Sequence, residues 1–164
     1  MIAQGTHQAF HPGRTAQLRT QDGQTIGYAG ELHPKLLQTE NLPERTCAFE
    51  VNFAELFASR SGVPQASPIY GYPAATQDVA LVVDENIPAS EVAQALRDGA
   101  GELLEDLRVF DDYRGQGVES GKKSLAFAMR FRAPDRTLTA EEASASREAA
   151  VAVAAERFGA VARV

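Results

Sequence analysis

Cysteine is nearly absent from this sequence, since Cys47 is the only one among 164 residues. A single thiol forms no intramolecular disulfide and supplies no cysteine-based zinc site. We expect Cys47, which stands among apolar neighbours, to be a buried structural thiol. No apolar run approaches the roughly 18 residues that a membrane-spanning helix needs, and the first ten residues lack the basic start and apolar stretch of a signal peptide. These absences predict a cytoplasmic protein that makes no membrane contact.

Catalytic and metal-binding motifs are also lacking. Gly115 and Gly117 have neither the third glycine nor the following helix of a dinucleotide-binding loop, and no Walker motif is present. The histidines lack metal-binding spacing, and His11 and His33 each precede a proline, which favours a role in a turn. The carboxylates of Asp111-Asp112, as neighbours in a strand, would point to opposite faces. We expect no metal site, no cofactor and no catalysis by this chain alone.

Enough apolar material is nevertheless present for a globular core. Hydrophobic residues make up 44% of the chain and charged residues 23%, both ordinary for a folded protein. The segment SRSGVPQASP, residues 59–68, is small, polar and contains proline and glycine, as linkers do. We therefore expect three parts: a first segment at 1–60, a linker at 61–67 and a domain at 68–164.

The first segment shows few elements of secondary structure. Strands at 15–20 and 24–30 flank Gln21-Asp22-Gly23, a hairpin signal. A short helix is expected from Pro34 to about Glu40, then a strand at 47–52 and a helical turn at 53–57. Three strands with so little helix form a thin core, so residues 1–60 resemble a small α+β piece of a larger fold.

The second part has a complete pattern. Its expected elements are strands at 78–84, 107–113, 124–132 and 160–164, and helices at 88–99 and 139–158. Thr139 and Glu142 match a capping box at the start of the second helix. The order βαββαβ predicts an α+β, ferredoxin-like sandwich, in which an antiparallel sheet carries both helices on one face.

Small residues are expected on the other face of this sheet. Alternation directs Leu125, Phe127, Met129 and Phe131 to the core, which leaves Ala80, Ser124 and Ala126 on a face without helices. Such a floor leaves room for a flat ligand. Val109-Phe110 breaks the alternation and indicates a bulge. Tyr113 ends this strand, and either phase of the strand leaves it near the rim of the floor. A rim aromatic beside a small-residue floor favours stacking of an unpaired base. An edge-strand tyrosine with a hydrated hydroxyl is the alternative.

Charge is distributed unevenly. The net charge is −6, yet the segment 114–132 is basic, with Glu119 as its one acid. A local basic strip suits contacts with a polyanion at a restricted site. The simpler alternative is a solvated strand edge, where lysines prevent pairing with another chain. The candidate phosphate contacts are Arg114, Lys122, Lys123, Arg130 and Arg132.

Eight motifs together resemble one family. They are Phe10-His11-Pro12-Gly13-Arg14, Ile26-Gly27-Tyr28-Ala29-Gly30-Glu31-Leu32-His33-Pro34, Ala48-Phe49-Glu50, Tyr72-Pro73-Ala74-Ala75, Asp78-Val79-Ala80-Leu81-Val82-Val83, Val109-Phe110-Asp111-Asp112-Tyr113-Arg114-Gly115, Gly121-Lys122-Lys123-Ser124-Leu125-Ala126-Phe127 and Pro134-Asp135-Arg136-Thr137-Leu138-Thr139. In order and spacing they resemble the C-terminal part of the β subunit of bacterial phenylalanyl-tRNA synthetase.

The resemblance implies a role in holding tRNA. Residues 68–164 would be the ferredoxin-fold anticodon-binding domain, and residues 1–60 the end of the subunit's catalytic-like but inactive module, with a class II synthetase-like sheet. Tyr113 would stack on an anticodon base of tRNA-Phe, with Ser124 and Ala80 lining the same pocket. The partner α subunit of an α2β2 enzyme would use ATP and magnesium to attach phenylalanine. Thr76-Gln77 stand where the family often has basic residues, which puts one phosphate contact in doubt.

Two other functions fit the pattern of elements. Amino-acid-sensing regulatory modules share the βαββαβ order. An assembly-only role is the other alternative, because strand edges in residues 1–60 would invite self-association.

Overall fold

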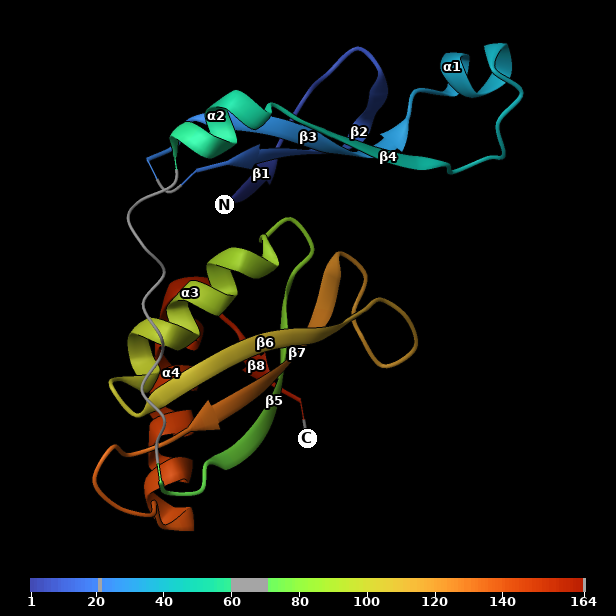
Figure 1. Ribbon diagram of the computed structural model, residues 1–164. Helices are drawn as coiled ribbons and strands as arrows, with labels where there is room; N and C mark the ends of the chain where they lie inside the picture. Colours follow the sequence, from blue (N-terminus) through green and yellow to red (C-terminus); the bar gives the residue numbers. More distant parts are fainter. Residues whose placement is uncertain (21, 60–70, 164) are drawn as a thin grey trace. The chain divides into compact units, whose positions relative to one another are not determined.

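The chain forms two compact units, Met1–Ala66 and Ser67–Val164, called here the N-terminal and C-terminal units. The computed structural model describes residues 1–20, 22–59 and 71–163 (Figure 1). The expected linker at 61–67 lies outside the described residues.

The N-terminal unit is a four-stranded antiparallel sheet in the order β1-β2-β3-β4. Its elements are β1 Ile2–Gln4, β2 Phe10–Arg19, β3 Thr25–Leu32, α1 Pro34–Thr39, β4 Cys47–Val51 and α2 Phe53–Ala58. The expected hairpin is confirmed as the β2–β3 pair. The sequence missed β1 and the start of β2. β1 is too short for alternation, and a register shift between Phe10 and Thr15 interrupts the pattern of β2.

Local hydrogen bonds explain two of the histidines. His11 Nδ1 accepts from the amide of Gly13 at 3.1 Å, and His33 Nδ1 accepts from the amide of Lys35 at 3.2 Å, where it caps α1. Both side chains thus have the turn role that the following prolines indicated.

The expectation of a buried thiol at Cys47 was wrong. Cys47 is exposed, and its thiol donates to the carbonyl of Arg45 at 3.4 Å. The physical reason is its position as the first residue of β4, a strand at the edge of the sheet. Apolar neighbours in sequence do not bury a residue when no further strand covers that edge.

The C-terminal unit is a four-stranded antiparallel sheet in the order β6-β7-β5-β8. Its elements are β5 Ala75–Asp84, α3 Ala89–Ala100, β6 Leu104–Tyr113, β7 Lys122–Phe131, α4 Ala140–Phe158 and β8 Val161–Ala162. Figure 1 shows α3 and α4 on the same face of this sheet. The predicted ferredoxin-like fold is therefore confirmed.

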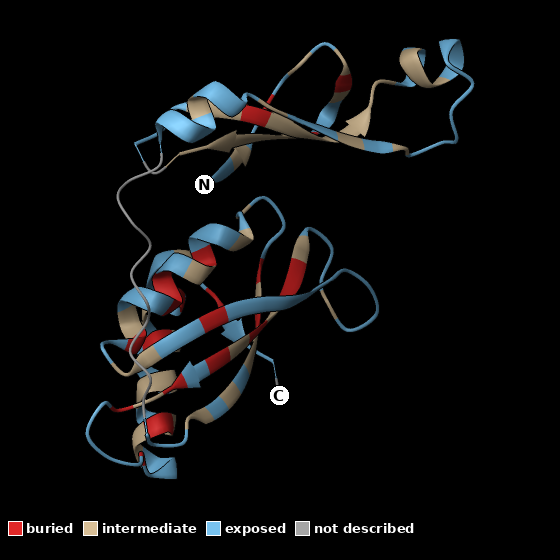
Figure 2. Ribbon diagram, viewed as in Figure 1, coloured by how far each residue is buried: buried red, intermediate tan, exposed pale blue. Residues whose placement is uncertain are grey.

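The core lies between this sheet and the two helices. Side chains from β5 and β7 alternate toward the helices, and Figure 2 shows the buried positions along β7. Gly99 allows close packing, because a Cβ there would lie 2.8 Å from the carbonyl oxygen of Ala149 on α4. The fully buried side chains include Leu81, Val92, Leu96, Leu125, Phe127 and Phe131.

The capping box of α4 is present as the sequence predicted. Thr139 Oγ1 accepts from the amide of Glu142 at 3.2 Å, and Glu142 Oε2 accepts from the amide of Thr139 at 2.9 Å. The backbone hydrogen bond from Thr139, followed by the Arg136 side chain, lowers the pKa of Glu142.

Replacing Thr139 by alanine is expected to destabilise the C-terminal unit by about 1 kcal/mol, because the first turn of α4 loses an acceptor for a free amide. Urea unfolding followed by circular dichroism measures the change. The neighbouring exposed Thr137 provides the control: Thr137→Ala is expected to shift the unfolding free energy by less than about 0.5 kcal/mol. Equal effects of the two substitutions would contradict the capping role.

Candidate nucleic-acid interface

The sheet of the C-terminal unit has one face turned away from α3 and α4, called here the open face. Strand β7 runs through it with β5 on one side and β6 on the other. Ser124 pairs with Val82 and Tyr113, and in the next row Ala126 pairs with Ala80 and Asp111. The structure thus brings together Tyr113, Ser124, Ala80 and Ala126, the residues that the sequence assigned to one surface.

A bulge in β6 places Tyr113 on the open face. The register shifts between Val109 and Asp111, which leaves Phe110 without a cross-strand partner. Leu107, before the bulge, faces the core and is 6% exposed. Without the extra residue Tyr113 would share the face of Leu107, since side chains alternate with a period of two. The bulge that Val109-Phe110 indicated is confirmed.

The phenol of Tyr113 is held by its own loop. Its hydroxyl donates to the carbonyl of Gln116 at 3.2 Å. Gly115 lies against the ring, and a Cβ there would come within 2.7 Å of the hydroxyl oxygen. The side chain is still 38% exposed. The ring is therefore oriented before any ligand arrives, with part of its surface free to be covered.

Arg163 is a residue of this surface that the sequence reading missed. Its amide donates to the carbonyl of Ala80 at 2.8 Å, which extends the pairing of β8 with β5. Its guanidinium carbon lies 5.5 Å from the centroid of the Tyr113 ring, within cation–π range. Antiparallel pairing of the expected closing strand with 78–84 was the signal that could have found it.

Most cations of the basic strip have carboxylate partners. Lys122 Nζ lies 3.1 Å from Glu119, and Arg130 Nε lies 2.6 Å from Glu105. Arg132 also pairs with Glu105, with its Nε 3.0 Å from Oε1 of that carboxylate. The fold thus brings Glu105, from outside the strip in sequence, against two of its arginines. The positive field of the open face is weaker than the sequence segment implied.

The remaining two residues of the strip differ in position. Arg114 pairs with Glu85 at 3.0 Å and with Asp112 at 2.8 Å. Lys123 is 5% exposed and pairs with Val83, whose side chain faces the helices. Because alternation directs Lys123 to the helix-covered side, its position does not support the expected phosphate contact.

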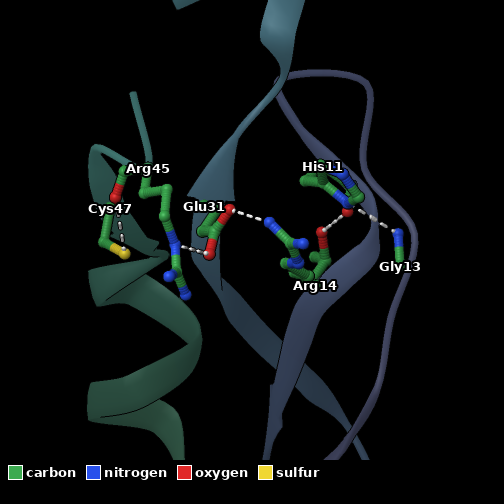
Figure 3. Close-up of polar contacts among 7 residues, drawn as sticks. His11, Gly13, Arg14, Glu31, Arg45 and Cys47 are labelled. Atoms are coloured by element: carbon green, nitrogen blue, oxygen red, sulfur yellow. Dashed lines mark hydrogen bonds and ion pairs between the residues drawn. The ribbon is translucent and has the colours of Figure 1, made fainter. Parts of the chain in front are cut away.

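A second polar cluster lies in the N-terminal unit (Figure 3). Glu31 on β3 accepts from Arg14 Nη1 at 2.6 Å and from Arg45 Nε at 3.2 Å. The hydrogen bond from Arg14 is the main cause that lowers the pKa of Glu31, whose side chain is 13% exposed. The cluster joins β2, β3 and the segment before β4. Its role is structural, because it links these three segments through the Glu31 carboxylate.

Residues 1–20, 22–59 and 71–163 contain no cluster of histidine, cysteine, aspartate or glutamate side chains that could hold a metal ion. None of the helices described there has the length and apolar character to cross a membrane.

Replacing Gly115 by alanine is expected to displace the Tyr113 phenol, because the added methyl group would lie within 2.7 Å of the hydroxyl oxygen. The hydroxyl bond to Gln116 should then be lost. Gly71 is the matched control, since no atom lies within 4 Å of a Cβ built there. The NMR chemical shifts of the Tyr113 ring measure both variants. Equal ring shifts in Gly115→Ala and Gly71→Ala would contradict the role of the Gly115 loop.

The antiparallel sheet carries both helices on one face and leaves the other open. On the open face, small residues lie beside an oriented tyrosine. This arrangement defines a ferredoxin-like domain with an open sheet face. Residues 71–163 match the family model described as "Ferredoxin-fold anticodon binding domain". The chain belongs to this family. Residues 1–53 match a second model, "Phenylalanyl tRNA synthetase beta chain CLM domain".

Full-length relatives agree with these matches. The chain is 54% identical to the phenylalanine–tRNA ligase beta subunit of Streptomyces avermitilis over 99% of its own length and 20% of the relative's. Identity to the same subunit of Leifsonia xyli is 52%, over 98% of the chain and 19% of the relative. Identity to the same subunit of Thermobifida fusca is 54%, over 94% of the chain and 19% of the relative. The chain therefore spans about a fifth of the length of these relatives, and its resemblance to the synthetase β subunit is confirmed.

Proposed function

We propose that the open face of the C-terminal unit holds the anticodon of tRNA-Phe. The observation that carries the proposal is the pairing of Tyr113 with Ser124, beside the Ala80–Ala126 pair. Together they form an oriented aromatic ring next to a floor without large side chains. Aromatic rings stack on unpaired bases, and single-stranded loops are the parts of RNA that proteins read in this way.

Arg163 adds to this arrangement. Its guanidinium lies near the ring of Tyr113 and carries a positive charge to the place where the base would stack. Arginine planes and aromatic rings both stack on bases. The Tyr113 and Arg163 side chains are therefore proposed to contact the same base.

The relatives also support a wider function for the chain. We propose that the chain acts within a phenylalanine–tRNA ligase, an α2β2 complex in the cytoplasm whose α subunit attaches phenylalanine with ATP and magnesium. The N-terminal unit would belong to the catalytic-like module, with domain limits of 1–60 and 68–164. The chain's own role would be to bind tRNA, without catalysis.

Binding of RNA hairpins by the 164-residue chain tests the proposal. Fluorescence anisotropy would compare the anticodon stem-loop of tRNA-Phe with a fully paired duplex of the same stem. The expected result is tighter binding of the stem-loop, since the stacked base is unpaired. A thermal-shift assay with free phenylalanine runs beside it. Equal affinity for the two RNAs would contradict the proposal, and stabilisation by phenylalanine without RNA binding would favour the regulatory alternative.

A further inference from the structure

Arg108 is an exposed cation of the open face that none of the preceding assignments uses. It pairs with Ala128 on β7, and Ala128 pairs with Asp78 on β5, so all three lie in one row of this face. Among the described residues no carboxylate lies within ion-pair distance of Arg108, in contrast to Lys122 and Arg130. Its charge is available to a ligand without breaking an existing ion pair.

Arg108 borders a hollow in the sheet surface. This hollow has a volume of about 250 Å³ and is lined by Thr76, Asp106, Arg108, Ala128, Met129 and Arg130. Ala128, with only a methyl group, forms its floor. Asp106, Arg130 and Thr76 lie in the next row of the sheet. The lining thus combines hydrogen-bond donors (Arg108, Arg130) with the acceptor Asp106 around this space.

The size and position of the hollow favour one group of a longer ligand. Small-molecule sites usually enclose about 300–1,000 Å³, so this one is small for a separate ligand. It lies on the same face as the Tyr113 site, because Ser124, Ala126 and Ala128 follow one another along β7 on that face. Ser124 and Ala128 are four residues apart, or roughly 13 Å at about 3.3 Å per residue. Protein surfaces that bind single strands follow several nucleotides in this way.

We propose that the hollow is a second nucleotide subsite, occupied by another nucleotide of the RNA strand whose base stacks on Tyr113. Arg108 contacts its phosphate, and Asp106 and Thr76 face the edge of its base. The inference rests on the proposed function, since the occupant belongs to the same RNA. With this subsite, the proposed RNA-binding surface runs from the Tyr113–Ser124 pair to the Arg108–Ala128 pair.

Salt dependence of binding to the anticodon stem-loop tests the phosphate contact. Each phosphate contact to a single strand contributes about 0.7 to the slope of log affinity against log salt. Arg108→Gln is expected to reduce that slope by about 0.7, whereas Arg108→Lys retains it. From 50 to 200 mM salt, the wild-type affinity should therefore fall roughly 2.6-fold further than that of Arg108→Gln. Arg147→Gln on α4, on the other face of the sheet, is the control for loss of one charge.

A second substitution tests occupancy of the hollow. Ala128→Leu fills it with an isobutyl group on the open face and is expected to weaken binding of the stem-loop. Because the displaced nucleotide also loses its contact with Arg108, the salt slope should fall by about 0.7, as for Arg108→Gln. Circular dichroism checks that each variant is folded.

The outcomes separate this inference from the function on which it rests. Weaker binding by Tyr113→Ala, with Arg108→Gln indistinguishable from Arg147→Gln, would overturn the second subsite and retain the Tyr113 site. Unchanged affinity in Ala128→Leu would also overturn the subsite. Absence of RNA binding by the wild-type chain would overturn both.

Discussion

Replacing Tyr113 by alanine is expected to weaken binding of the tRNA-Phe anticodon stem-loop by about 1–3 kcal/mol, or roughly 5- to 150-fold. The loss follows from the stacking energy of one base, because the ring is the large aromatic surface beside the Ser124 and Ala126 floor. The ring is already oriented by its hydroxyl bond to Gln116, so little ordering opposes stacking. Fluorescence anisotropy at fixed salt concentration measures the effect.

Two controls define what the Tyr113 result means. Tyr113→Phe keeps the ring and loses the hydroxyl bond to Gln116, so most of the affinity should remain. Tyr72→Ala removes another tyrosine of the C-terminal unit with similar exposure, 41% against 38% for Tyr113, and should leave binding unchanged. If Tyr72→Ala weakened binding as much as Tyr113→Ala, stacking at Tyr113 would not be the cause.

Replacing Phe127 by alanine is expected to destabilise the C-terminal unit by about 3–5 kcal/mol. Phe127 lies on the central strand β7, is 0% exposed and belongs to the core between sheet and helices. Its removal both loses buried apolar surface and leaves a cavity that the two helices cannot close. Hydrogen exchange of the β7 amides measures the change within this unit.

Val109 provides a matched control for this loss. It is the cross-strand partner of Phe127 on β6, yet it is 45% exposed. Val109→Ala is expected to change the unfolding free energy by less than about 0.5 kcal/mol, as substitutions at exposed positions usually do. A Phe127→Ala effect as small as this would show that the core does not depend on the β7 aromatic residues.

The sequence predicted the C-terminal fold well because its signals are local. Alternation along β7 identified the core-facing set, and the Thr139 capping box marked the start of α4. The bulge was indicated by the adjacent Val109 and Phe110, which break alternation. The N-terminal unit was predicted less completely, since β1 has only three residues and gains its structure by pairing with β2.

Charge at the candidate site could not be predicted from neighbours in sequence. Glu85 and Glu105 lie outside the basic strip, but the fold brings them against Arg114, Arg130 and Arg132. Ion pairing depends on which strands adjoin, and that is a property of topology. Arg108 was missed for the same reason, because its position opposite Ala128 depends on the register of β6 against β7.

The open face of the C-terminal unit, and not its helix-covered side, is proposed to hold RNA. The most direct measurement is an NMR titration of the chain with the anticodon stem-loop. The expected result is a set of chemical-shift changes centred on Tyr113, Ser124, Ala80 and Ala126, extending along β7 to Ala128. Changes confined to α3 and α4, or to the N-terminal unit, would contradict RNA binding by the open face.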